Sequence, residues 1–223
     1  AICDLLDEPG EATADELRTL GHGAFYAHVD VTQSAEIEQF VERVHRELGP
    51  IDILVNNVGA GSGGRSLEDE EDERWRTIID VNLSSMFYVA KPVVRRMIER
   101  GQGGAIINMA SMSSLIINNI APRHNTPYCV SKAGVAHLTK GMASNWAQHG
   151  IRVNAIAPGY MDTDQTYWMK QNPELEARLL ANVPLGRYGN ADELKGAVVY
   201  LASSASSFMT GHIMVIDGGT TIW

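Results

Sequence analysis

The stretch Ala105-Ile106-Ile107-Asn108-Met109-Ala110-Ser111 decides the fold, because a short and almost continuous apolar run ends there on a hydroxyl side chain. A run of this length and composition is typical of a β-strand that is buried on both faces of a sheet. The sequence therefore predicts further buried strands wherever such runs recur. They recur at Ala1–Leu6, Gly23–Val29, Ile51–Asn57, Ile151–Ala157 and His212–Asp217.

Amphipathic segments separate the predicted strands. They cover Glu11–Leu20, Gln33–Leu48, Asp69–Arg100, Pro127–His149 and Ala191–Ser203. Strands that alternate with helices indicate an α/β fold, in which a doubly wound parallel sheet carries helices on both faces. No repeat or linker divides the chain, so residues 1–223 are predicted to form a single domain. The least regular part, residues 159–189, is a candidate lid over a site.

Residue types at two helix ends predict how those helices begin. Thr126 is expected to cap a helix whose first residue is Pro127, and Gly150 is expected to close it. Asn190 followed by Glu193 predicts a capping box, in which each residue satisfies a backbone amide of the other.

The composition excludes several classes of protein. The chain has 223 residues and a formal net charge of −9, which argues against nucleic acid as a partner. No run of 18 apolar residues occurs, so no membrane span is predicted. Two cysteines do not make a disulfide scaffold and suit a reducing cytosol, so a cytoplasmic location is expected. The seven histidines form no metal-binding motif, so no metal is expected.

Polar or small residues follow the predicted strands. In an open α/β sheet, ligands bind beyond the carboxyl ends of the strands, so the residues that follow them are expected at one rim. The residues at these positions are Asp4, Asp30, Asn57, Gly59, Ser111, Pro158 and Gly159.

Tyr128 and Lys132 are four residues apart, which places them on one face of a helix. A phenol is a weak base at neutral pH, and a nearby ammonium lowers its pKa, so the pair suits acid–base chemistry. Taken alone, the spacing is explained better by a packed tyrosine and a solvated lysine, because so short a motif occurs by chance. Asn82 lies inside a predicted helix, where its side chain competes for backbone hydrogen bonds. An asparagine at such a position indicates a tertiary role.

An ordered series of motifs resembles the short-chain dehydrogenase/reductase family from residue 1 to the C-terminus. Any one motif is weak, but their order is specific. The series comprises Asn56-Asn57-Val58-Gly59, Val81-Asn82-Leu83, Ser111 after its strand, Tyr128-Cys129-Val130-Ser131-Lys132-Ala133-Gly134, Arg152-Val153-Asn154-Ala155-Ile156-Ala157-Pro158-Gly159 and Asp217-Gly218-Gly219.

The sequence departs from the family pattern at three points. The family's glycine-rich loop and the strand before it do not occur, so residue 1 is expected to fall in the second strand of a Rossmann-like fold. Ser111 and Tyr128 are 17 residues apart, a longer interval than is common in the family, which should reshape the substrate pocket. Ser113 and Ser114 lie near Ser111, which is assigned by its place at the strand end.

The resemblance implies hydride transfer between a nicotinamide cofactor and an alcohol or carbonyl carbon. By position, Tyr128 would be the acid–base group and Lys132 would lower its pKa and hold the nicotinamide ribose. Ser111 would orient the substrate oxygen, and Asn82 would hold a water that links Lys132 to solvent. These four residues are the predicted catalytic set.

The resemblance also implies the remaining contacts. Asp4 would accept both ribose hydroxyls of NAD and repel the 2′-phosphate of NADP, so NAD is the expected cofactor. Asp30 and Val31 would meet the adenine edge, and Asn57 and Gly59 the adenosine ribose. The nicotinamide amide would be flanked by Pro158, Gly159, Met161 and Thr163. Expected substrate contacts are Ser113, His124, Tyr160, Tyr167 and Trp168.

A sugar or polyol is the expected substrate, because the C-terminal tail and the segment after residue 110 resemble those of sugar and polyol dehydrogenases in the family. A 3-oxoacyl or hydroxysteroid reductase is the enzymatic alternative. A non-catalytic dinucleotide-fold protein is the alternative if the chain begins at Ala1. The resemblance also implies a homotetramer.

Overall fold

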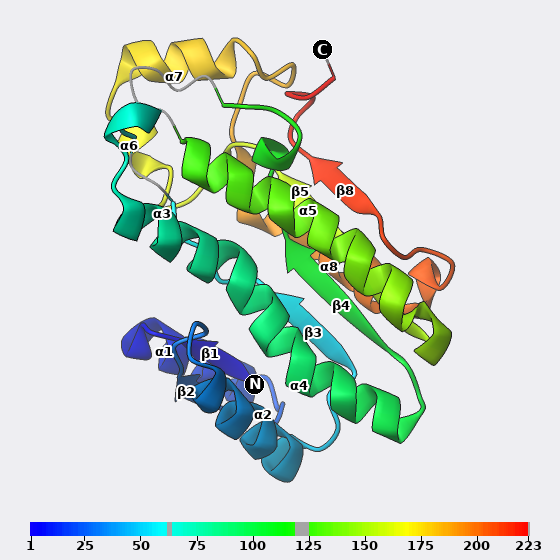
Figure 1. Cartoon of the computed structure of the whole chain (residues 1–223). Coiled ribbons are helices and arrows are strands. Elements are labelled where there is room, and N and C mark those ends of the chain that lie inside the picture. Colours follow the sequence, from blue (N-terminus) through cyan, green and yellow to red (C-terminus); the bar gives the residue numbers. More distant parts are fainter. Residues whose placement is uncertain (62–63, 119–124, 223) are drawn as a thin grey trace.

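The computed structural model describes residues 1–61, 64–118 and 125–222 and has the predicted α/β architecture (Figure 1). The strands are β1 (Ile2–Asp4), β2 (Tyr26–His28), β3 (Ile53–Asn56), β4 (Gly104–Met109), β5 (Ile151–Pro158), β6 (Met161–Asp162), β7 (Gly189–Asn190) and β8 (Ile213–Ile216). The α-helices are α1 (Asp7–Thr19), α2 (Ser34–Leu48), α3 (Asp72–Ile79), α4 (Ser85–Arg100), α5 (Thr126–Trp146), α6 (Tyr167–Lys170), α7 (Pro173–Leu180) and α8 (Lys195–Ala202).

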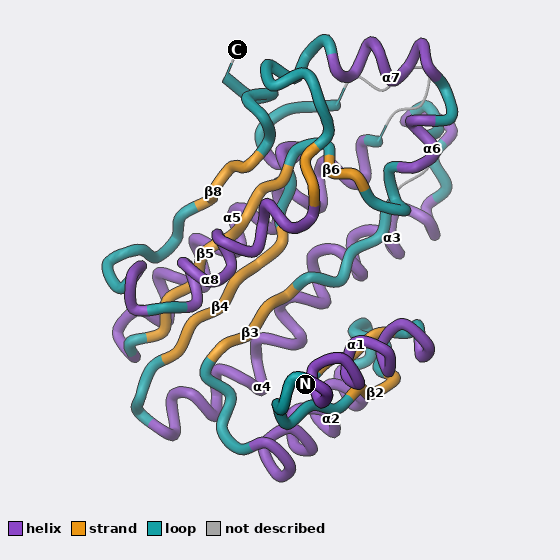
Figure 2. The backbone as a smooth tube through the Cα atoms, turned by 180° about the vertical axis from the view of Figure 1, so that it is seen from behind, coloured by secondary structure: helices purple, strands orange, loops and turns teal. Residues whose placement is uncertain are grey.

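The long strands are all parallel, but within the described residues they form two sheets. β1 pairs with β2, and a four-stranded sheet has the order β3-β4-β5-β8 (Figure 2). A groove of about 380 Å³ lies between β1 and β3 and is lined mainly by apolar side chains. The continuous sheet expected from the sequence is therefore interrupted here. The expectation of a strand before residue 1 remains a prediction.

Helices cover both faces of the four-stranded sheet, as a doubly wound fold requires. Neighbouring residues of β4 point to opposite faces, because side chains alternate along a strand. Ile106 packs in a cluster with side chains of α2, α4 and α5, whereas Ile107 packs against Leu201 of α8. Burial on both faces explains why β4 is apolar except at Asn108.

A buried row of polar side chains links the sheet to α5. Asn56 Nδ2 donates to Asn108 Oδ1 at 2.9 Å, and Asn108 Nδ2 donates to Thr139 Oγ1 at 3.0 Å. All three residues are buried, so the two asparagine amides need these partners, while the Thr139 hydroxyl also donates to the Val135 carbonyl at 2.8 Å. The row holds β3, β4 and α5 in one register and thereby fixes the helix that carries Tyr128 and Lys132.

We expect Asn108→Ala to lower the free energy of unfolding by about 3 kcal/mol, because it leaves the buried amide of Asn56 without its side-chain partner and opens a cavity in the core, while the Thr139 hydroxyl keeps its bond to the Val135 carbonyl. Urea unfolding followed by circular dichroism measures the change. Asn145→Ala is the matched control, since this exposed amide bonds only its own helix at the Gly141 carbonyl, and its cost should stay within about 0.5 kcal/mol. Equal costs for both substitutions would contradict the role of the row.

Several predicted element boundaries need correction. The helix expected at 69–100 consists of α3, a π-helical turn (Asp80–Ser84) and α4. Helix α5 begins at Thr126, so Asn125 rather than Thr126 is its N-cap residue. The physical reason is that Pro127 is accepted anywhere in a first turn, where backbone amides lack helical partners. Gly150 closes this region with φ +71°, and the predicted capping box at Asn190 and Glu193 is confirmed.

The candidate lid is more regular than its sequence suggests. Residues 159–189 contain α6 and α7 besides β6, which pairs with β7 in a parallel two-residue ladder. Asn172 caps α7 by accepting from the Leu175 amide at 3.1 Å. These elements lie together beyond the carboxyl ends of β4 and β5 (Figure 1), which is where the sequence predicts a site.

Candidate active site

Helix α5 carries Tyr128 and Lys132 on one face, as their spacing predicts. Lys132 is 4% exposed, and its Nζ donates to the Met109 carbonyl at 2.7 Å and lies 5.7 Å from the centre of the Tyr128 ring. Burial lowers the pKa of Lys132 to about 8. An ammonium with this pKa is still mostly charged at neutral pH, so the site holds a buried positive charge beside the phenol.

The pKa of Tyr128 is raised, which differs from the lowering that the sequence predicts. Burial is the largest cause, and the hydrogen bond with Ser111 acts in the opposite direction. The physical reason is that burial disfavours the phenolate, while the Lys132 ammonium is engaged by a backbone carbonyl. In this state of the protein the phenol therefore holds its proton at neutral pH.

Ser111 lies directly after β4, where the apolar run ends. Its backbone is extended, and its Oγ accepts from the Ser113 amide at 3.1 Å, so the side chain caps the short 3₁₀ turn that follows. The same hydroxyl is hydrogen-bonded to Tyr128. Ser111 and Tyr128 therefore meet although 17 residues separate them, and Ser111 rather than Ser114 is the serine paired with the phenol.

Asn82 is fully buried in the π-helical turn between α3 and α4. Its Oδ1 accepts from the Ala60 amide at 2.7 Å, and its Nδ2 donates to the Ala60 carbonyl and the Ser131 hydroxyl, both at 3.0 Å. π-Helical turns are frequent at functional sites because they redirect a side chain. Asn82 thus has the tertiary role that the sequence indicates, which is to tie the loop after β3 to α5.

A cavity of about 390 Å³ opens beside Tyr128 and Lys132 at the end of the sheet. A Cβ atom at Gly59 would lie 3.4 Å from both Lys132 Nζ and Asn82 Oδ1, so the glycine keeps room at the cavity wall. Lys132 makes one hydrogen bond within the described residues, and an ammonium has three donors. The residues therefore fit a ligand with vicinal hydroxyls. The lining is Asn57, Gly59, Met109, Ala110, Tyr128, Lys132, Thr163, Asp164 and Gln165.

The residues predicted for the adenosine end lie along the groove between β1 and β3. Asp4, Val31 and Asn57 all line it. Asp4 Oδ1 accepts from the Leu5 and Leu6 amides at 2.7 and 3.1 Å, so the carboxylate is held at the strand end. Asp30, which was predicted at the same end, does not line this groove.

Asp30 Oδ1 accepts from both the amide and the hydroxyl of Thr32, which lowers the pKa of this carboxyl. The structure therefore gives Asp30 a turn-forming contact at the start of α2. Its predicted contact with adenine stays a prediction.

The residues predicted around the nicotinamide divide among different cavities. Thr163 lines the cavity beside Lys132, whereas Met161 lines a smaller one of about 80 Å³ near Arg187. Pro158 ends β5 and pairs in register with Ile216. A Cβ atom at Gly159 would lie 2.6 Å from the Asp217 Cα atom, so only glycine allows the chain to turn there. Gly159 lines a cavity that includes Tyr128, and Met161 lines a different one, which shares Tyr160 with it.

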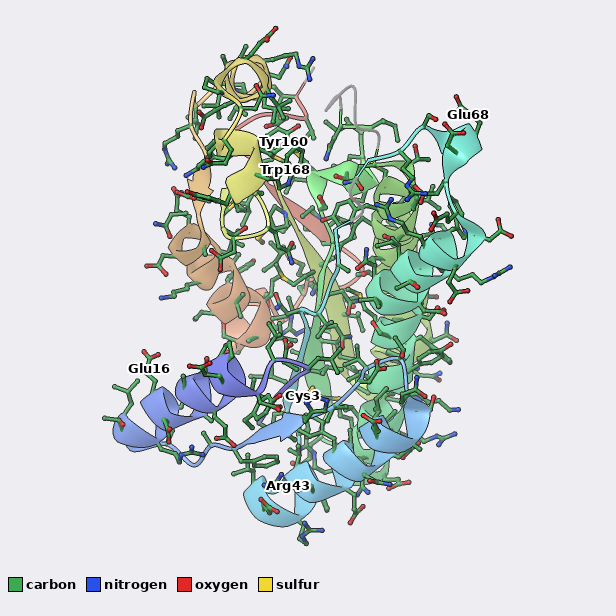
Figure 3. All side chains as sticks on the ribbon, turned by 90° about the vertical axis from the view of Figure 1, so that its left-hand side faces the viewer. Cys3, Glu16, Arg43, Glu68, Tyr160 and Trp168 are labelled. Carbon is green, nitrogen blue, oxygen red and sulfur yellow. The ribbon has the colours of Figure 1, made fainter. Side chains whose placement is uncertain are left out.

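A second cavity of about 350 Å³ adjoins the first and includes Ser111 and Tyr128. Of the predicted substrate contacts, Ser113, Tyr160 and Trp168 line it, and Figure 3 shows Tyr160 and Trp168 side by side at one end of the molecule. Tyr167 is 60% exposed, and His124 lies outside the described residues. Sequence reasoning missed further lining residues, because they come from turns with no motif. They are Met112, Asn118, Asn125, Gln165, Thr166 and Met169, besides Gly61 and Gly64.

Residues 1–61, 64–118 and 125–222 contain neither a candidate metal site nor a candidate membrane span. No group of three or more histidine, cysteine or carboxylate side chains gathers there as a metal site would require. In the same residues, no helix combines the length and the apolar character needed to cross a bilayer.

Comparison with known proteins gives consistent matches. A sequence profile described as enoyl-(acyl carrier protein) reductase matches residues 1–221. A galactitol 2-dehydrogenase from Rhizobium johnstonii is 40% identical over 219 residues, which are 97% of this chain and 84% of that protein. A 5-keto-D-gluconate 5-reductase from Escherichia coli strain K12 is 38% identical over 221 residues, which are 99% of this chain and 85% of that protein.

A solved structure shows the same fold. A gluconate 5-dehydrogenase from Burkholderia cenocepacia, crystallised in complex with NADP and tartrate, superposes with a TM-score of 0.91 at 36% identity. The match covers 100% of this chain and 85% of that one.

A parallel α/β sheet with a serine, a tyrosine and a lysine gathered at its carboxyl rim defines the class of dinucleotide-dependent oxidoreductases. The chain belongs to the short-chain dehydrogenase/reductase family, as the resemblance of its motifs predicts. It is an enzyme of the oxidoreductase type, with a single Rossmann-like fold.

Proposed function

We propose that this protein transfers hydride between NAD(H) and a secondary alcohol or ketone of a sugar or polyol. The observation that carries the proposal is the meeting of Ser111, Tyr128 and Lys132 where two cavities adjoin. One cavity fits a ribose, and the other places Ser111, Ser113 and Asn125 among apolar side chains. Relatives named for galactitol and 5-keto-D-gluconate point to a sugar or polyol substrate.

The side chains have distinct tasks in the proposed reaction. Tyr128 takes the hydroxyl proton during oxidation and returns it during reduction, and Ser111 donates a hydrogen bond to the substrate oxygen. Lys132 binds ribose hydroxyls and stabilises the phenolate by its charge. Asn82 holds the loop after β3 and, we propose, a water that connects Lys132 to solvent. The bound nicotinamide supplies the hydride chemistry itself.

We propose NAD over NADP as the cofactor, because Asp4 sets a carboxylate at the end of β1. A carboxylate accepts from both hydroxyls of a ribose and repels a 2′-phosphate. The Burkholderia relative was crystallised with NADP. The preference between NAD and NADP therefore differs within the family or depends on residues other than Asp4. Asp30 and Val31 would contact the adenine edge.

We expect Asp4→Ala to lower kcat/KM for NAD by about 10-fold and to reduce the ratio of NAD to NADP use by at least that factor, since a charged hydrogen bond is lost. Initial rates with each cofactor measure the ratio. Asp4→Asn is the matched control, because its amide oxygen still accepts from Leu5 and Leu6. A ratio unchanged in both variants would show that Asp4 does not select the cofactor.

A substrate panel with NAD and NADP tests the proposed function. Oxidation of hexitols or aldonates by the purified protein would support it. Faster turnover of 3-oxoacyl thioesters or hydroxysteroids would favour the reductase alternative, because that alternative predicts activity on bulky apolar substrates. Calorimetry with NAD distinguishes an enzyme from a non-catalytic dinucleotide-fold protein, because the latter would neither turn over nor bind in the micromolar range.

We also propose a cytoplasmic homotetramer. Phe87 of α4 and Val130 of α5 are 45% and 42% exposed, and apolar side chains on adjacent helices favour contact with another subunit. Sedimentation of the purified protein measures the subunit number, and a monomer at micromolar concentration would refute the tetramer.

A further inference from the structure

The hydroxyl of Tyr26, on β2, contacts both ends of the connection between β1 and α1. Tyr26 is buried, and its hydroxyl oxygen lies 2.8 Å from the Asp4 carbonyl oxygen and 2.8 Å from Asp7 Oδ1. Burial and the hydrogen bond to Asp7 raise the pKa of Tyr26 to about 12, so the hydroxyl keeps its proton and acts as a donor. One side chain thus ties the last residue of β1 to the first residue of α1.

The two residues between these ends hold the carboxylate of Asp4. Leu5 and Leu6 are exposed, so little packing fixes them, yet both of their amides donate to Asp4 Oδ1. The direction of the carboxylate therefore depends on the shape of this two-residue connection. Because the Tyr26 hydroxyl contacts the residue on either side of the connection, it restrains the connection and, through it, the carboxylate.

Helix α1 is adapted to the ring of Tyr26. A Cβ atom at Gly10 would lie 2.2 Å from Cδ2 and from Cε2 of this ring, so only glycine allows the helix to pack on it. Glycine weakens a helix interior, because it loses more conformational freedom on folding than any other residue. The chain thus keeps the Tyr26 ring in place although the glycine weakens α1.

We propose that Tyr26 is a positioning residue for the adenosine end of NAD, because its hydroxyl holds the connection that sets the Asp4 carboxylate toward the ribose hydroxyls. The inference rests on the proposed function, in which Asp4 accepts from that ribose. Asp4 lines the groove between β1 and β3 and Tyr26 does not, so Tyr26 acts through Asp4. Its contribution is to the affinity for NAD, and the proton transfer by Tyr128 does not depend on it.

Tyr26→Phe removes the hydroxyl without leaving an acceptor unpaired. The Asp4 carbonyl still accepts from the Val29 amide at 3.1 Å, and Asp7 Oδ1 keeps its 2.8 Å contact with His28 Nδ1. The ring keeps its packing on α1, so the variant is expected to fold. Its effect should therefore appear in cofactor binding.

Calorimetric titration with NAD tests the inference in a double-mutant cycle of Tyr26→Phe and Asp4→Ala. We expect Tyr26→Phe to raise Kd for NAD by about 5-fold in the wild type and by less than about 2-fold when added to Asp4→Ala, because residues that act through one another are not additive. In initial rates Tyr26→Phe should raise KM for NAD by a similar factor and leave kcat and the KM of the alcohol within about 2-fold. Tyr88, a half-buried residue of α4 outside the groove, gives the matched control: Tyr88→Phe should leave Kd within about 2-fold.

Amide hydrogen exchange of the protein without cofactor gives a second readout. The Leu5 and Leu6 amides should exchange at least about 3-fold faster in Tyr26→Phe than in the wild type, and at the wild-type rate in Tyr88→Phe. An unchanged Kd, a loss of affinity that persists in full beside Asp4→Ala, or unchanged exchange of these amides would overturn the inference while the wild type still binds NAD. A wild type that neither binds nor reduces NAD would instead refute the proposed function, and the inference with it.

Discussion

Tyr128→Phe is expected to lower kcat by about 10³-fold with little change in KM. The substitution removes one hydroxyl, and general acid–base catalysis by a positioned side chain is worth about 10²- to 10⁴-fold. The ring is half-buried on the first turns of α5 and would keep its packing, so the cofactor and substrate cavities should remain. Initial rates with the best alcohol of the panel measure the loss.

Tyr200→Phe is the matched control for this prediction. Tyr200 is 37% exposed on α8, on the face of the sheet opposite α5, and lines neither of the two cavities beside Tyr128. Removal of its hydroxyl should leave kcat within about 2-fold, because surface substitutions have small effects. Thermal unfolding of both variants checks the fold. Full turnover by Tyr128→Phe with an intact fold would contradict the proposed mechanism.

The sequence predicted the rim of the site because each residue there follows a buried strand. Ser111 is the example: the apolar run before it fixes β4, and the hydroxyl then falls at the carboxyl end. The sequence also predicted that Tyr128 and Lys132 share one face of a helix, since a spacing of four residues places them there. Their contact with Ser111 needed the family resemblance, because no local rule relates residues so far apart in sequence.

Other features depend on tertiary contacts that periodicity does not contain. The π-helical turn at Asn82 keeps the apolar pattern of a continuous helix, so the sequence showed only that an asparagine was out of place. Asp30 turns toward Thr32 instead of a ligand, as a residue after a strand can do for purely local reasons. Asn118 belongs to no motif, and its hydrogen bond to Ser113 follows from the fold alone.

Lys132→Met is expected to lower kcat/KM by at least 10²-fold and, at pH 7, to make the protein more stable. The activity falls because the variant loses the charge that stabilises the phenolate and the donors proposed for the ribose. Methionine has a similar length and is apolar, so it fills the same buried space. Lys132→Arg keeps a charge and is the control for activity: a partial recovery is expected, limited by the larger guanidinium in a buried space.

The gain in stability follows from the sign of the pKa shift. Burial lowers the pKa of Lys132 from 10.5 in the unfolded chain to about 8 in the folded one. Below pH 8 both states carry the proton, and the folded state bears the full cost of burying the charge. Between pH 8 and 10.5 the folded state has released the proton while the unfolded state still holds it, so the free energy of unfolding rises with pH. One unit of pKa corresponds to about 1.4 kcal/mol, which gives a cost of about 3 kcal/mol at pH 7.

Methionine removes this cost but also the hydrogen bond to the Met109 carbonyl, worth about 1 kcal/mol, so a net gain of about 2 kcal/mol is expected at pH 7. Urea unfolding of the wild type and Lys132→Met at pH 7, 8, 9 and 10 measures it. The advantage of the variant should shrink as pH rises, because only the wild type gains stability from releasing this proton. Groups such as Cys3 titrate in both proteins, so they cancel in the difference. A variant less stable than the wild type at pH 7 would mean that the surroundings stabilise the buried ammonium, and it would contradict the burial cost inferred from the lowered pKa.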